Sequence, residues 1–208
     1  MAGLGVGRRR AYALGAAIAW ISGGLAYLIA EAMAAKAFRP HYSYVHNVIS
    51  DLGVASSLMN AAFCVQGTLF LVGAILSVRA FETRKAGPFL TLAAANAVGN
   101  ILIATFHSGS AARADGTAWV HAIGALLAIV GGNAAILAGS LIIGGLPRYR
   151  RVSAGLAALG LLSFTMFAIE SKIAAVNVLP TAVWERCSVY SIIAWQVVTA
   201  ILCYTRSE

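Results

Sequence analysis

The stretch AYALGAAIAWISGGLAYLIAEAMAA, residues 11–35, decides how this chain folds. It runs for 25 residues with a single charged side chain, Glu31. A helix needs about 20 mostly apolar residues to cross the hydrocarbon core of a bilayer. The apolar part of a cleavable secretory signal is shorter, at about 7–15 residues. Arg8–Arg10 precede the stretch, and basic residues also precede the apolar part of a secretory signal. The length of residues 11–35 nevertheless predicts an uncleaved first transmembrane helix.

Five further windows of this kind follow along the chain, at approximately 56–78, 87–106, 118–143, 152–172 and 186–204. Hydrophobic residues make up 60% of the 208 positions and charged residues only 11%. An ordinary soluble domain has roughly 25% charged residues. The connections between the windows leave no room for a soluble module. The sequence therefore predicts an all-α, polytopic integral membrane protein, with six transmembrane helices in a single domain over residues 1–208.

The net charge of +8 is spread unevenly over the two sides of this bundle. If the N-terminus is cytoplasmic, ten basic residues lie on that side: Arg8, Arg9, Arg10, Arg79, Arg84, Lys85, Arg148, Arg150, Arg151 and Arg206. Five lie on the other side: Lys36, Arg39, Arg113, Lys172 and Arg186. This bias orients membrane proteins during insertion, so it explains the positive charge without a nucleic-acid partner. We expect a multi-pass protein of the plasma membrane with both termini in the cytoplasm.

Residues that can act as acids or bases gather on the extracytoplasmic side. They are His41, His46, His107 and His121, with Glu31, Asp51, Asp115, Glu170 and Glu185. Polar residues also collect at helix ends simply because water is available there, and this interpretation suffices for Asp115 and Glu185. Glu31 and Glu170 fall inside predicted spans, where an ionisable group is costly and faces a partner or a cavity. They are either functional groups or paired structural carboxylates.

The third predicted helix carries a polar stripe. At 100° per residue, Asn96, Asn100 and His107 fall within about 40° of one helix face. Asparagines inside a membrane span commonly hold helices together through hydrogen bonds worth about a kilocalorie per mole or less. On either interpretation, the stripe directs His107 towards the centre of the bundle.

The segment HNVISDLG, residues 46–53, is the strongest local candidate for a site. His46 and Ser50 would lie one turn apart on a helix, and Asp51 follows directly. Ser50 or Asp51 would serve equally well as the N-cap of the second transmembrane helix, because Ser and Asp are favoured there. Neither HExxH nor HxxxH spacing is present, and Cys64, Cys187 and Cys203 lack metal-ligand spacing. We expect no metal and no cofactor.

Three short motifs are similar to a known family: His46–Gly53, Phe106-His107 and His121-Ala-Ile-Gly-Ala125. Together they resemble the prokaryotic membrane family known as domain of unknown function 998. More distantly they resemble the Frag/DRAM/Sfk group of six-helix proteins, and this likeness implies association with membrane lipids. The residues that match are Ile49, Ser50, Asp51, Gly53, His121, Gly124 and Ala125. His107 stands where the relatives are expected to have Gln or Pro. The paired HxxxH of ceramidase-like hydrolases is absent.

We therefore expect an enzyme that acts on a membrane lipid or isoprenoid at the outer membrane boundary by acid–base transfer, hydrolysis or cyclisation. The candidate catalytic residues are Asp51, His107, His121 and Glu170. The candidate ligand-binding residues are His46, Ser50, Glu31 and Asn100. The alternative hypothesis is a non-catalytic lipid-binding, transport or assembly subunit that uses the same polar cluster.

Overall fold

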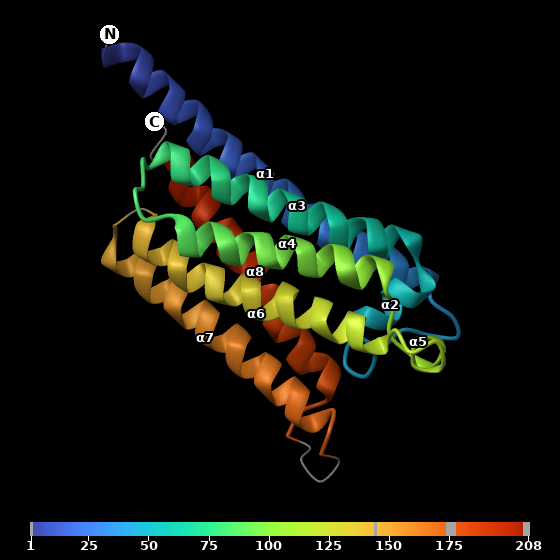
Figure 1. Ribbon diagram of the computed structural model, residues 1–208. Coiled ribbons are helices and arrows are strands. Elements are labelled where there is room, and N and C mark those ends of the chain that lie inside the picture. The colour runs from blue at the N-terminus through green and yellow to red at the C-terminus, as the bar shows by residue number, and fades with distance from the viewer. Residues whose placement is uncertain (1, 144, 174–177, 206–208) are drawn as a thin grey trace.

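The computed structural model describes residues 2–143, 145–173 and 178–205, and every regular element among them is a helix. The long helices are α1 (Ala2–Ala37), α3 (Ser57–Ala80), α4 (Gly87–Thr105), α6 (Ala118–Ile142), α7 (Pro147–Glu170) and α8 (Thr181–Thr205). Two short helices, α2 (Ile49–Ala55) and α5 (Ser110–Ala114), lie in the connections (Figure 1). Within the described residues, six helices are long and apolar enough to cross a membrane, which confirms the prediction of a six-helix membrane protein.

Several boundaries differ from the predicted ones, and two of the differences involve basic residues. The first span covers Gly5–Ala37 rather than 11–35, because Arg8–Arg10 continue the helix instead of preceding it. Helix α7 begins at Pro147 rather than at 152. Proline has no amide hydrogen to lose in the first turn of a helix and is favoured there. The basic residues that follow Pro147 are therefore part of the helix.

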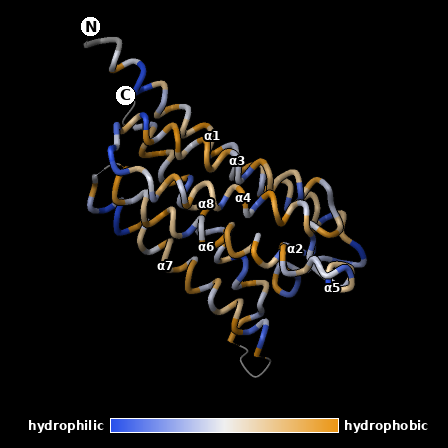
Figure 2. The backbone as a smooth tube through the Cα atoms, in the orientation of Figure 1, coloured by the Kyte–Doolittle hydropathy of each residue, from blue (hydrophilic) through white to orange (hydrophobic). Residues whose placement is uncertain are grey.

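The six long helices form a closed ring in which α1 packs against α3, α3 against α4, α4 against α6, α6 against α7, α7 against α8, and α8 against α1. Helix α1 begins and α8 ends at one end of the bundle, called here the terminal end (Figure 1). Helices α2 and α5 lie at the opposite end, called here the α2–α5 end. Hydrophobic residues cover the length of the helices and hydrophilic residues gather at the two ends, as a bilayer requires (Figure 2).

Small residues let the helix backbones approach closely. A Cβ atom on Gly99 of α4 would lie 2.2 Å from the backbone nitrogen of Ala128 and 2.6 Å from the carbonyl oxygen of Gly124, both in α6. At this contact the amide nitrogen of Asn96 donates to the carbonyl oxygen of Ala128 over 2.5 Å. Close approach and interhelical hydrogen bonds replace the hydrophobic effect as the force between helices in lipid. The structure thus confirms that Asn96 joins helices.

Candidate functional site

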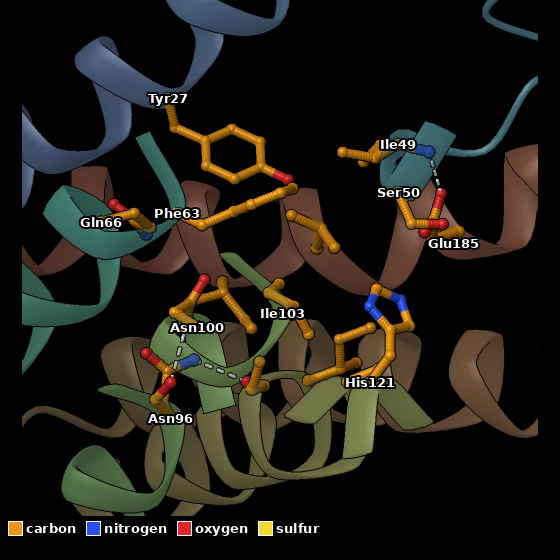
Figure 3. A pocket seen from close by; sticks show the side chains of 15 residues that line it. Tyr27, Ile49, Ser50, Phe63, Gln66, Asn96, Asn100, Ile103, His121 and Glu185 are labelled. Atoms are coloured by element: carbon orange, nitrogen blue, oxygen red, sulfur yellow. Dashed lines mark hydrogen bonds between the residues drawn. The ribbon is translucent and has the colours of Figure 1, made fainter. Parts of the chain in front are cut away.

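A cavity of about 60 Å³ lies inside the bundle, in the half nearer the α2–α5 end (Figure 3). Side chains from α1, α2, α3, α4, α6 and α8 line it. The polar ones are Tyr27, Ser50, Gln66, Asn96, Asn100, His121 and Glu185. The remaining wall is aliphatic and aromatic. At about 10–15 Å³ for each water, the cavity has room for roughly four to six waters or for a small polar group of similar size.

His121 lies in the first turn of α6 and its ring orientation is fixed. Its Nδ1 atom is 2.7 Å from the carbonyl oxygen of Phe106, the residue that ends α4. A carbonyl oxygen can only accept a hydrogen bond, so Nδ1 carries the proton. In the neutral imidazole, the other nitrogen, Nε2, then keeps its lone pair. His121 therefore offers a hydrogen-bond acceptor and potential base at the cavity wall.

Helix α2 covers one side of the cavity through Ile49 and Ser50. The carboxylate of Glu185 in α8 accepts a hydrogen bond from the backbone N–H of Ile49. The first N–H groups of a helix have no partner within the helix, and negative charge is stabilised beside them. Glu185 is only 7% exposed, so its interpretation as an ordinary helix-end residue is wrong.

Neither Ser50 nor Asp51 caps a helix. The N-cap of α2 is Val48 and the N-cap of α3 is Ser56, and neither makes a side-chain capping bond. Both Ser50 and Asp51 lie inside the first turn of α2 instead. Only Ser50 contributes to the cavity wall; Asp51 is half-buried and does not line the cavity.

A buried ion pair adjoins the cavity. The Nε atom of Arg186 lies 3.4 Å from Oε1 of Glu31, and the two residues are 6% and 1% exposed. The hydroxyl of Tyr190 donates to Oε2 of Glu31 over 2.8 Å. Glu31 is thus a paired carboxylate. Its position in an apolar run indicated that it needs a partner, but Arg186 was expected only as one of the charges at the helix ends.

Arg186 also holds the connection between α1 and α2 against the bundle. Its Nη1 atom donates to the carbonyl oxygen of Asn47 over 2.8 Å, and its Nη2 atom donates to the hydroxyl of Tyr42. The guanidinium lies 5.0 Å from the ring centre of Tyr44, as in a cation–π contact. Burial raises the pKa of the Tyr42 hydroxyl well above its ordinary value of 10.0. The phenol therefore keeps its proton and donates to the carbonyl oxygen of Val48 over 3.0 Å.

The other predicted site residues lie away from the cavity. His107 is exposed, beyond the end of α4, and its Nε2 atom is 2.9 Å from the amide nitrogen of Asn60. The prediction that the polar stripe of α4 directs His107 into the bundle is therefore wrong. Glu170 ends α7 and accepts a hydrogen bond from the backbone N–H of Val178 over 2.9 Å. His46 is exposed in the connection before α2.

The structure thus brings Ser50, Asn100 and His121 together at the cavity and places Glu31 beside it. The polar residues here that sequence reasoning did not assign to a site are Tyr27, Gln66, Asn96, Glu185 and Arg186. Within residues 2–143, 145–173 and 178–205, no three His, Cys, Asp or Glu side chains are grouped as metal ligands.

Four residues of the sequence motifs meet at this cavity. Ile49, Ser50, His121 and Ala125 all line it, although they come from helices far apart in the chain. Gly53 has a packing role, because a Cβ atom there would lie 2.9 Å from the side-chain oxygen of Asn60.

Six helices that are long and apolar enough to cross a membrane define a multi-pass membrane protein. The chain belongs to the family described as Protein of unknown function (DUF998), whose model matches residues 5–202. No curated protein matches the chain, and no solved structure does. The more distant similarity to the Frag/DRAM/Sfk group stays a prediction.

Proposed function

We propose that this protein binds the polar group of a membrane lipid or isoprenoid in the cavity near α2. One observation carries the proposal: residues of the family motifs, Ser50 of α2 and His121 of α6, share a cavity wall inside an apolar bundle. Binding sites of this kind are mostly apolar with a few convergent polar groups. A membrane-dissolved amphiphile can present its polar group at this depth while its apolar chain stays in lipid.

Acid–base catalysis on the bound ligand is the second candidate function. It is supported by the hydrogen bond from Nδ1 of His121 to the carbonyl of Phe106, which orients the ring and leaves Nε2 as the basic nitrogen. A general base needs this kind of orientation and hydrogen-bond reach to its substrate. Ser50 and Glu185 are the polar neighbours on the same wall. Asp51, His107 and Glu170 do not line this wall.

We further propose that the α2–α5 end faces the extracytoplasmic side of the plasma membrane. Nine of the ten basic residues assigned to the cytoplasm fall in the described part of the chain, and Arg206 lies outside it. Of the five on the other side, Arg186 is buried in an ion pair, which leaves four exposed. Nine basic residues against four keep the bias that the whole sequence shows, and this bias favours the proposed orientation.

Impermeant thiol labelling of intact cells tests the orientation. In a variant without the native Cys64, Cys187 and Cys203, single cysteines replace Ser110 and Gly87, both exposed and at opposite ends of the bundle. We expect labelling at position 110 and none at position 87. The reverse pattern would place the cavity on the cytoplasmic side.

The function is tested by purifying the protein in lipid nanodiscs and identifying the lipids that co-purify. We expect one lipid or isoprenoid species to be enriched over its share of the host membrane. Incubating that species with the protein then separates the two candidates: an unchanged mass supports binding alone, and a protein-dependent mass change supports catalysis. A lipid composition identical to that of the bulk membrane would contradict both.

A further inference from the structure

Each side-chain amide nitrogen on the cavity wall donates one hydrogen bond to a protein acceptor. Asn96 donates to the carbonyl oxygen of Ala128 over 2.5 Å, and Asn100 donates to the carbonyl oxygen of Asn96 over 2.9 Å. Gln66 donates to the side-chain oxygen of Gln196 over 2.6 Å. Backbone carbonyls accept only, so the two asparagine amides have one possible orientation. Each of the three amides therefore commits one of its two N–H donors to the protein.

The other fixed donors at the wall are occupied as well. The Nδ1–H of His121 is directed at the carbonyl oxygen of Phe106. The backbone N–H of Ile49 is directed at the carboxylate of Glu185. Among the described wall groups, the hydroxyls of Tyr27 and Ser50, which can equally accept, and the second N–H of each amide remain to donate.

Acceptors, in contrast, remain available. Nε2 of neutral His121 has its lone pair, and the side-chain oxygen of Asn100 is the end of that amide turned towards the cavity (Figure 3). The side-chain oxygens of Asn96 and Gln66 are buried without a hydrogen-bond partner. The side-chain oxygens of Glu185 accept from the backbone N–H groups of Ile49 and Ser50. The wall thus has several side-chain acceptors without a partner.

Among the described residues, no arginine or lysine lines the cavity. Arg186 follows Glu185 in α8, but its guanidinium is turned away, to Glu31, Asn47 and Tyr42. A phosphate or carboxylate inside the cavity would therefore lie beside the acidic side chain of Glu185 without an arginine or lysine to compensate its charge, which is costly in an apolar surrounding.

From this donor and acceptor inventory, we propose that the cavity selects a ligand whose polar group donates hydrogen bonds and carries no negative charge: an alcohol or an amine at the end of an apolar chain. The inference rests on the proposed function and names the ligand class of the same site. The cavity has room for about four to six non-hydrogen atoms, so it admits such a polar group together with the first carbons of the chain. The rings of Tyr27 and Phe63 line the same space, with their centres 5.8 Å apart. Aromatic rings in this position can bind an ammonium group through cation–π contacts.

A panel of ligands with one chain and four polar groups tests the selectivity. Dodecanol, dodecylamine, dodecanoate and dodecyl phosphate are titrated at neutral pH against the full chain in nanodiscs, with binding followed by native mass spectrometry. We expect the alcohol and the amine to bind at least tenfold more tightly than the two anions. Glu185→Gln, which keeps an acceptor oxygen but no charge, separates the two preferred groups: it should weaken the amine more than the alcohol. Asp51→Asn, a nearby acid off the wall, is the matched control and should change neither.

The outcomes distinguish the two levels of the proposal. Filling the cavity with Ala125→Phe should abolish the selective binding, because Ala125 lines the cavity. If the anions bind more tightly than the alcohol and the amine, and this binding is also lost in Ala125→Phe, the proposed ligand class would be overturned. The proposed binding function would still stand. If all four ligands bind and Ala125→Phe leaves their binding unchanged, the proposed binding function itself would be overturned.

Discussion

Replacing Arg186 by methionine removes the guanidinium from the buried network and keeps the length of the apolar stem. The substitution leaves Glu31, 1% exposed, without its ion-pair partner at 3.4 Å. At this distance the attraction between two unit charges is about 5 kcal/mol with an effective dielectric constant near 20. Removing one partner of a buried pair typically costs 3–5 kcal/mol. We therefore expect Arg186→Met to lower the free energy of unfolding by about 3–5 kcal/mol.

A double-mutant cycle isolates the ion pair from the other bonds of Arg186. Glu31→Gln alone leaves the arginine unpaired and should cost a similar amount. The double variant carries neither charge, so its loss should be clearly smaller than the sum of the two single losses. The exposed Arg113→Met is the control and should stay within about 0.5 kcal/mol of the wild type.

Equilibrium unfolding in mixed micelles at increasing SDS fraction measures these differences, with native-state hydrogen exchange as a second readout. Because Arg186 holds the carbonyl oxygen of Asn47 and the hydroxyl of Tyr42, exchange should rise in the connection before α2 in Arg186→Met and stay unchanged in Glu31→Gln. Single losses that add within about 0.5 kcal/mol would refute the coupling between Glu31 and Arg186.

Three further substitutions test the packing and the limits of the site. Gly99→Ala should lower the free energy of unfolding by about 1–3 kcal/mol or more, because its Cβ would lie 2.2 Å from the backbone nitrogen of Ala128. The control Gly155→Ala, whose Cβ would have nothing within 4 Å, should leave the unfolding midpoint unchanged. Equal midpoints for the two variants would disprove the close α4–α6 contact. Asp51→Asn should retain the co-purifying lipid at the wild-type ratio, and a tenfold loss would return Asp51 to the site. His107→Ala should also retain it, at a stability cost of about 1 kcal/mol for the lost hydrogen bond; loss of the lipid from folded protein would assign His107 a direct role.

The six spans could be predicted because each is a run of apolar residues long enough for a bilayer. Helix α2 could not be predicted, because seven residues are too few to show a helical period. Its first backbone N–H donates a hydrogen bond to a carboxylate 136 positions away in the sequence. The parts of the ion-pair network are also far apart in sequence: Tyr190 and Glu31 are separated by 159 positions. A single sequence shows that Glu31 needs a partner without showing which residue it is.

His107 was misplaced for a local reason. The helical period of Asn96 and Asn100 was extended beyond the end of α4 at Thr105, where the backbone becomes extended at Phe106. His121 was found because its motif opens a helix, and Ser50 because its motif segment stands alone between two spans. Their meeting at one cavity depends on the closed ring of helices, which no local pattern contains.

The central claim, that the cavity near α2 holds the polar group of a membrane lipid or isoprenoid, is tested most directly by two phenylalanine substitutions in the same helix. Ala125 lines the cavity, and Ala122, three positions earlier, is exposed on the outside of α6. Both variants are purified in nanodiscs beside the wild type, and the bound lipid is counted by native mass spectrometry. We predict that Ala125→Phe loses the lipid that co-purifies with the wild type, whereas Ala122→Phe keeps it. Retention of that lipid by folded Ala125→Phe protein would contradict the claim.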